Sequence, residues 1–302
     1  MFYYSYNDYL RKRFNGKVRR IGLNAGFVCP TRGGGSASGG CLFCNESAFS
    51  QFPGGNIPSL KEQITRSMDS FRKRRGTEKF IAYFQNASGT NAPLKKLKAA
   101  YDVIRDFPEI VSLVISTRPD CVDDEKLDLI ASYASDYDVW VEYGLQTIHD
   151  RTLKAIGRGH TFLQSADAIN RTSRKGIKAA AHVILGLEGE SRQDMIATAR
   201  EISRLPLSGI KLHVLHVLRG TSLERLYKKG KILIMQRSEY IDAACDFMEN
   251  LRSDCVMIRL VSDSRREFLV APEWMNDKLS VIRGIGKEFK SRGTRQGSAF
   301  TR

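Results

Sequence analysis

Residues 19–44 read RRIGLNAGFVCPTRGGGSASGGCLFC, which joins a short strand pattern to a loop that carries three cysteines. We predict a strand over residues 19–27, with the loop leaving its carboxyl end. Eleven residues separate Cys29 from Cys41, and two separate Cys41 from Cys44. The glycines between Cys29 and Cys41 would let the backbone fold tightly around an inorganic ligand, where side chains would clash. The pattern therefore predicts a metal site directly after the first strand.

Three cysteines with no fourth ligand close by argue against an ordinary zinc site. Structural zinc takes four ligands, yet the next cysteine is Cys121 and the first histidine is His149. An iron–sulfur cubane held by three thiolates keeps one iron open for a small chelating molecule. A phosphate-binding loop is the rival interpretation of residues 33–40, but no Gly-Lys-Ser/Thr follows them. We therefore expect the three loop cysteines to hold an iron–sulfur cluster.

The chain beyond this loop alternates short apolar runs with amphipathic stretches, which is typical of parallel strands joined by crossover helices. Five further strands are expected, at residues 79–85, 110–116, 139–146, 179–186 and 209–218. This α/β pattern predicts a partial, TIM-like (β/α)6 barrel over residues 18–222. Residues 1–17 form an N-terminal segment, and residues 223–302 form a C-terminal α+β extension with a helix at 237–252, a strand at 256–261 and a basic tail.

Two of the expected strands place polar side chains toward the inside of the barrel. Glu142 alternates with Tyr143, so Glu142 would face the pore while Tyr143 packs on the helices. A pore-facing carboxylate is costly without a partner, which favours a functional role for Glu142. On the fifth strand a lone His182 is more often a satisfied structural residue than a ligand. His213 and His216 are three apart, so on one strand at most one of them would reach the pore.

The composition is strongly basic, with 48 Lys and Arg against 33 Asp and Glu and a net charge of +15. Such a charge attracts polyanions, and nucleic acid is the natural candidate, whereas a solvated basic surface without a dedicated partner is the alternative. Two clusters of basic residues favour a binding surface for nucleic acid. They are Arg72, Lys73, Arg74 and Arg75, and, in the tail, Lys287, Lys290, Arg292 and Arg295.

Cysteine usage and hydropathy indicate a reducing compartment. Six cysteines are too few and too unevenly spaced for a disulfide framework, and Cys121, Cys245 and Cys255 are expected to be isolated thiols. The opening residues mix aromatic and charged side chains, and nowhere do 18 apolar residues follow one another. We therefore expect a cytoplasmic protein that does not contact a membrane.

The Cys41-Leu-Phe-Cys44 ending, placed just past the first strand, resembles the radical-SAM superfamily. The gap of eleven residues before it departs from the usual three-residue spacing of that superfamily. Together with other stretches along nearly the whole chain, this departure resembles the YhcC/YtqA-type subgroup, which is similar to the radical-SAM domain of the Elongator catalytic subunit. These stretches are residues 83–85 (YFQ), 90–93 (TNAP), 116–120 (STRPD), 142–147 (EYGLQT), 158–160 (RGH), 182–187 (HVILGL), 212–218 (LHVLHVL), 259–263 (RLVSD) and 271–274 (APEW).

The resemblance implies a [4Fe-4S] cluster on Cys29, Cys41 and Cys44 whose open iron binds the methionyl amine and carboxylate of S-adenosylmethionine (SAM). It further implies reductive cleavage of SAM to a 5′-deoxyadenosyl radical, fed by an electron donor such as flavodoxin or ferredoxin. Arg118 and Arg158 could each meet a carboxylate or phosphate, or form a surface ion pair. By position, the residues implied to contact SAM are Gln85, Asn86, Thr90, Asn91, Glu142, Ile184, Gly186 and His216.

The resemblance also implies a substrate class. The leading hypothesis is a radical-SAM enzyme that modifies tRNA at the C5 side chain of the wobble uridine, where remodelling an existing carboxymethylaminomethyl group is the economical reaction. A small-molecule or protein substrate for the same chemistry is one alternative. A basic, zinc-stabilised RNA-binding module is an alternative of another class, and iron with acid-labile sulfide in anaerobically purified protein would separate it from the enzymes.

Overall fold

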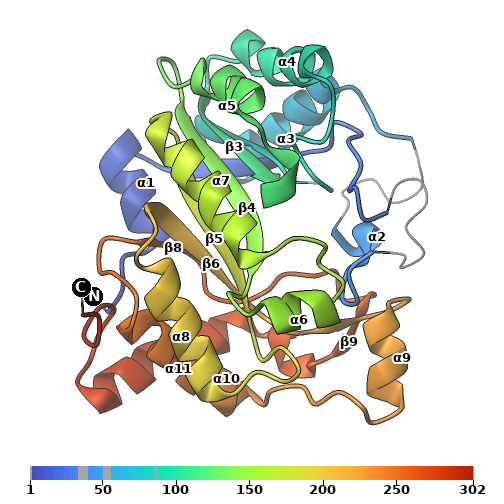
Figure 1. Ribbon diagram of the computed structural model, residues 1–302. Coiled ribbons are helices and arrows are strands. Elements are labelled where there is room, and N and C mark those ends of the chain that lie inside the picture. The colour runs from blue at the N-terminus through green and yellow to red at the C-terminus, as the bar shows by residue number, and fades with distance from the viewer. Residues whose placement is uncertain (1, 33–39, 50–55, 86, 302) are drawn as a thin grey trace.

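A computed structural model describes residues 2–32, 40–49, 56–85 and 87–301. Its centre is a curled sheet in which seven strands of the described chain run parallel, in the order β1-β2-β3-β4-β5-β6-β8 (Figure 1). The predicted partial barrel is therefore confirmed. The strands are β1 (Val18–Leu23), β2 (Lys79–Phe84), β3 (Ile110–Thr117), β4 (Asp138–Gln146), β5 (Lys178–Leu185), β6 (Leu207–Val214) and β8 (Val256–Arg259).

Helices cover the outer face of the sheet and bury a large apolar core against it. Several of them begin at a side chain that accepts a hydrogen bond from the first turn, among them Ser59, Asp123, Thr161 and Ser191. The helices are α2 (Glu46–Phe49), α3 (Leu60–Arg75), α4 (Leu94–Asp102), α5 (Asp124–Ala131), α6 (Asp150–Ala155), α7 (Phe162–Arg174), α8 (Arg192–Ile202), α9 (Ser222–Lys228), α10 (Arg237–Glu249) and α11 (Lys278–Arg292), with short 3-10 turns at Val103–Asp106, Pro119–Cys121 and Glu273–Asn276.

The C-terminal region contributes to the barrel itself. The strand expected within the extension, β8, pairs with β6 in parallel and becomes the seventh strand, with Lys211 opposite Arg259. The expected sixth strand also differs, because β6 ends at Val214 and the chain turns before β7 (Val217–Leu218). β7 then pairs antiparallel with β9 (Leu269–Ala271) in a separate small sheet.

Helix α1 (Tyr6–Phe14) closes the end of the barrel where the strands begin. Its Leu10 packs with Tyr83 and Trp140 inside the barrel. The Tyr9 hydroxyl donates to both carboxylate oxygens of Asp138, at 2.9 and 2.8 Å, at the first residue of β4. The segment ahead of α1 forms a parallel bridge between Ser5 and Met257. The pore is therefore plugged at this end, and its open end lies at the carboxyl ends of the strands.

Gln296 ties the two ends of the molecule together, and the termini lie side by side in Figure 1. Its backbone N–H donates to the carbonyl of Phe2 at 2.8 Å, and its side-chain oxygen accepts from Tyr4 N–H at 3.0 Å. Its side-chain nitrogen donates to the carbonyls of Arg252 and Cys255, each at 2.7 Å. Gln296 thus links the N-terminal segment to the start of β8.

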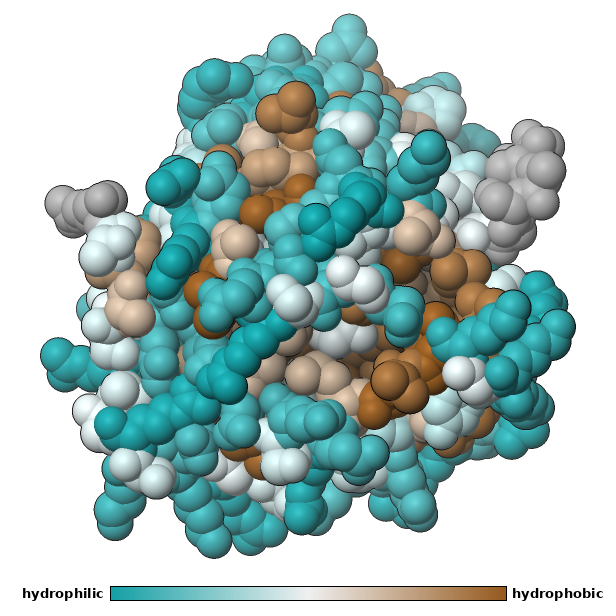
Figure 2. Space-filling view, turned by 60° about the horizontal axis from the view of Figure 1, so that its bottom comes forward, coloured by the Kyte–Doolittle hydropathy of each residue, from teal (hydrophilic) through white to brown (hydrophobic). Residues whose placement is uncertain are grey.

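The outer surface is mostly hydrophilic. Figure 2 shows one face on which apolar residues gather in a hollow surrounded by hydrophilic ones. Across the described ranges, no helix combines the length and apolar character needed to cross a membrane.

Candidate active site

The three loop cysteines line a single cavity of about 190 Å³ beside the strand ends. Cys29, Cys41 and Cys44 are all free thiols. In the part of the chain that the structure describes, no three His, Cys, Asp or Glu side chains already form a metal-binding group. Residues 33–39, in the middle of the loop, lie outside that part. Three soft thiol donors on one cavity fit an iron–sulfur cluster that completes the site when it binds.

Backbone hydrogen bonds hold the second half of this loop against two helices. Leu42 N–H donates to Ile156 O at 3.0 Å, and Leu42 O accepts from Leu223 N–H at 2.9 Å. Cys44 N–H donates to Cys41 O at 3.0 Å, which closes the turn between the two cysteines. Burial raises the pKa of the Cys44 thiol to about 11. A bound metal ion would lower that pKa and hold Cys44 as the thiolate.

Two buried arginines flank the cysteines, so neither forms the surface ion pair considered from the sequence. Arg158 Nη1 lies 3.6 Å from Cys41 Sγ, while its Nε and Nη2 donate to Gly144 O at 3.1 and 2.7 Å. Arg118 is 3% exposed and donates twice to Asp120 at 2.8 Å. Both guanidinium groups line the cavity, where their charge would offset that of three thiolates.

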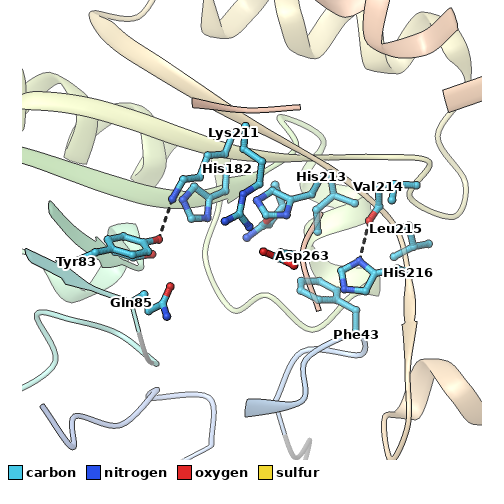
Figure 3. Close-up of a pocket in the computed structure, with 14 residues that line it drawn as sticks. Phe43, Tyr83, Gln85, His182, Lys211, His213, Val214, Leu215, His216 and Asp263 are labelled. Atoms are coloured by element: carbon cyan, nitrogen blue, oxygen red, sulfur yellow. Dashed lines mark hydrogen bonds between the residues drawn. The ribbon is translucent and has the colours of Figure 1, made fainter. Parts of the chain in front are cut away.

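A second cavity, of about 200 Å³, adjoins the first inside the pore. The two share Phe43, Gln85 and His182 among their lining residues. Figure 3 shows His182, Lys211 and His213 directed into this space, with Phe43 and Gln85 across from them. A group bound at the cysteine cavity would therefore lie next to one bound in the pore.

Glu142 is the centre of a buried polar network at the base of this second cavity. Its Oε2 accepts hydrogen bonds from Tyr83 Oη at 2.8 Å, from His182 Nε2 at 3.0 Å and from Lys211 Nζ. Lys211 Nζ also donates to Tyr83 Oη at 2.9 Å. Burial alone would raise the pKa of Glu142, but the charge of Lys211 and the bond from His182 outweigh it and hold that pKa well below its usual range. Glu142 is thus an anion kept in place by its partners.

His182 has both of the roles that the sequence left open. It faces the pore, and it is satisfied by its bond to Glu142. Burial and the nearby charge of Lys211 lower the pKa of His182 to about 4. The ring is therefore neutral at neutral pH and donates its Nε2 proton to the carboxylate.

Some of the residues predicted to contact SAM line the two cavities, and others do not. Gln85, Ile184 and His216 line the cavities. Thr90 is fully buried and bonds Thr117 Oγ1 at 2.6 Å, while Asn91 donates to Val28 O at 2.9 Å. Neither lines these two cavities. Gly186 and Glu142 also lie outside their linings, and Asn86 lies outside the described residues.

The expectation that only one of His213 and His216 could reach the pore is wrong. Both line the same cavity. The alternation rule fails because β6 ends at Val214, so His216 is no longer on the strand, and its Nδ1 lies 2.9 Å from Val214 O. The β-forming residues that continue through Leu218 hid this break.

Sequence reasoning missed the basic residues of the pore. Arg20, Lys211 and Arg259 lie on β1, β6 and β8, and the guanidinium of Arg20 lies 4.6 Å from the centre of the Tyr83 ring. The signal available for Lys211 was that it shares the parity of His213 within an otherwise apolar strand.

The residues of the two basic clusters differ in whether carboxylates pair with them. Arg72 pairs with Glu109, and Arg292 bonds Asp246 at 2.7 Å and Glu288 at 2.6 Å. Lys73, Lys287, Lys290 and Arg295 are exposed. The side chains of Arg74 and Arg75 lie outside the described residues.

Two curated relatives match almost the whole chain. The uncharacterized protein YtqA of Bacillus subtilis is 35% identical over 99% of this chain and 93% of its own length. YhcC of Escherichia coli is 32% identical over 97% of this chain and 94% of its own length. A part-length match, 31% identical over 40% of this chain and 26% of the other, is the tRNA uridine(34) acetyltransferase of Dehalococcoides mccartyi.

A solved structure shares this fold. The archaeal Elp3 of Methanocaldococcus infernus aligns with a TM-score of 0.66 at 16% identity, over 92% of this chain and 64% of that one. The model of the radical SAM superfamily matches residues 34–202, and that of the radical SAM C-terminal domain matches residues 207–291. The chain therefore belongs to the radical SAM superfamily, whose members bind a [4Fe-4S] cluster and SAM.

Proposed function

We propose that this radical SAM protein modifies tRNA, at the C5 substituent of the wobble uridine. The observation that carries the proposal is the 31% identity to a tRNA uridine(34) acetyltransferase over 40% of this chain. The match covers 26% of that enzyme, so its acetyl transfer is not part of the proposal. Remodelling a C5 side chain that is already present is the reaction we favour.

The residues of this chain take the following roles in the proposal. Cys29, Cys41 and Cys44 hold the cluster, and Arg118 and Arg158 balance its charge. When bound, the cluster and SAM supply the electron and the 5′-deoxyadenosyl radical that abstracts hydrogen from the substrate. Gln85, Ile184 and His216 would orient the cofactor in its cavity, and Phe43 would help to exclude water. The electron donor would be a flavodoxin or ferredoxin.

Nucleoside analysis of tRNA tests the substrate. Cells that lack the gene are expected to accumulate one precursor nucleoside at position 34 and to lose its product, because a single step of remodelling is blocked. Digested tRNA from both strains, separated by liquid chromatography and mass spectrometry, gives the measurement. Identical profiles would move the proposal to a small-molecule or protein substrate for the same radical chemistry.

The exposed basic residues of the C-terminal tail provide a second test. Replacing Lys287, Lys290 and Arg295 by glutamine should weaken tRNA binding. The slope of the logarithm of the binding constant against the logarithm of the salt concentration should fall by about one unit, or slightly less, for each phosphate that is no longer neutralised. Fluorescence titration of tRNA at several salt concentrations measures both quantities. Arg292→Gln is the matched control, because its guanidinium is held by carboxylates, so it should lower stability and leave the slope unchanged. An unchanged slope in the triple variant would place the footprint elsewhere.

A further inference from the structure

Cationic side chains outnumber anionic ones inside the pore. Lys211 and Arg259 are cross-strand partners on β6 and β8, and Arg20 reaches the same network from β1. Glu142 is the carboxylate bonded to this group, while Asp263, which also lines the cavity, pairs outward with Lys278. Lys211 is paired with Glu142, so in the described part of the pore the guanidinium groups of Arg20 and Arg259 are left without a bonded carboxylate. An uncompensated charge in a desolvated site is costly.

Arg259 and His213 are the members of this group with open hydrogen-bonding capacity. Within the described ranges the Arg259 side chain makes no hydrogen bond or ion pair, although it lines the pore cavity. The buried Nε2 of His213 has no hydrogen-bond partner there either. His213 shares the parity of Lys211 on β6, so donors from two strands face one space. Such donors cost free energy unless a ligand satisfies them.

We propose that Arg259, Lys211 and His213 bind an oxyanion group, a carboxylate or a phosphate, that the substrate carries into the pore. Arg259 offers a planar, bidentate fork, and Lys211 Nζ, which donates to Glu142 and Tyr83, has one N–H donor left beside it. The cavity of about 200 Å³ would take the substituent that carries this oxyanion. The oxyanion would fix that substituent next to the cysteine cavity, which shares Phe43 and Gln85 with the pore.

Arg259, Lys211 and His213 do not suit SAM itself, which the proposed function places against Gln85, Ile184 and His216 in the same cavity. SAM carries a sulfonium and an ammonium group against one carboxylate, so an excess of positive charge repels it. The cysteine cavity has its own cations, Arg118 and Arg158, to balance a cluster. The inference rests on the proposed radical chemistry, because it assigns the substrate side of the same site, but it does not require that the substrate be tRNA.

Arg259→Gln in anaerobically reconstituted, cluster-loaded protein is the test. Melting temperatures are measured in sodium acetate, in sodium phosphate and in sodium chloride of equal ionic strength. The parent should be stabilised by acetate or phosphate beyond chloride, and the probe that acts identifies the oxyanion. Arg259→Gln should lower the affinity of the protein for that probe at least tenfold. In chloride alone it should melt at an equal or higher temperature, since it removes a repelling charge and breaks no bond.

Arg204→Gln is the matched control, because it removes the same charge from the exposed turn that follows α8. It should bind the probe like the parent. The affinity for SAM should be unchanged in both variants. Three outcomes would each overturn the proposed pocket. The parent could be stabilised by neither anion, or Arg259→Gln could still bind the probe like the parent. The third is that Arg259→Gln loses affinity for SAM while it still binds the probe. These outcomes are independent of the nucleoside profile, so a wrong substrate class and a wrong pocket can be told apart.

Discussion

Replacing Cys29, Cys41 or Cys44 by alanine is expected to remove most of the iron and to abolish reductive cleavage of SAM. Each substitution takes away one of three thiolate anchors, and a cubane held by two has neither a stable nor a redox-competent geometry. Iron and acid-labile sulfide in anaerobically purified protein measure the first effect. Formation of 5′-deoxyadenosine with dithionite as the reductant measures the second.

Alanine at Cys121, Cys245 or Cys255 provides the control. All three thiols are buried and free, and the sequence places each far from any ligand spacing. Iron content should stay at the parent level, although packing losses could lower stability. A triple variant of the loop cysteines that still cleaved SAM would refute the ligand assignment. Zinc in place of iron and sulfide in the parent would instead favour the RNA-binding module.

Glu142→Ala is expected to lower the free energy of unfolding by about 3–5 kcal/mol. The substitution leaves the ammonium of Lys211, which is 1% exposed, without its anion, and it removes the acceptor shared by Tyr83 and His182. Urea unfolding followed by circular dichroism measures the loss.

The double variant Glu142→Ala with Lys211→Met separates the pair from the rest of the network. Removing both charges should recover much of the loss, because the cost comes from the unpaired ammonium and not from the missing carboxylate alone. Strictly additive losses would mean that Lys211 and Glu142 do not stabilise each other. Glu142→Gln, which keeps an acceptor of the same size, should lose less than Glu142→Ala.

The parts of this molecule that sequence could predict are those determined locally. Strand and helix periods and the Cys41-Leu-Phe-Cys44 spacing are all read within a few neighbouring residues. They were enough for the barrel and for the three candidate ligands. They were also enough to orient Glu142, because its alternation with Tyr143 puts only one of them in the apolar core.

The basic side of the pore could not be predicted in this way. Lys211 lies 69 residues from Glu142, and its partner on the next strand is Arg259, so the network exists only after distant strands have paired. The place of β8 was missed for a similar reason, since the helix-rich segment between β6 and β8 looked like an appendage. His216 was misjudged because β-forming residues continue past the true end of β6.

The position of α1 has a consequence for how the chain is made. In chain order α1 precedes every strand of the sheet, yet Ser5 bridges Met257, and Tyr4 is tied to Gln296. A growing chain must therefore carry an unplaced N-terminal helix while the first six strands of the sheet assemble. A helix that precedes the whole sheet in the chain therefore reaches its full set of contacts only after β8, more than 240 residues later, has joined the sheet.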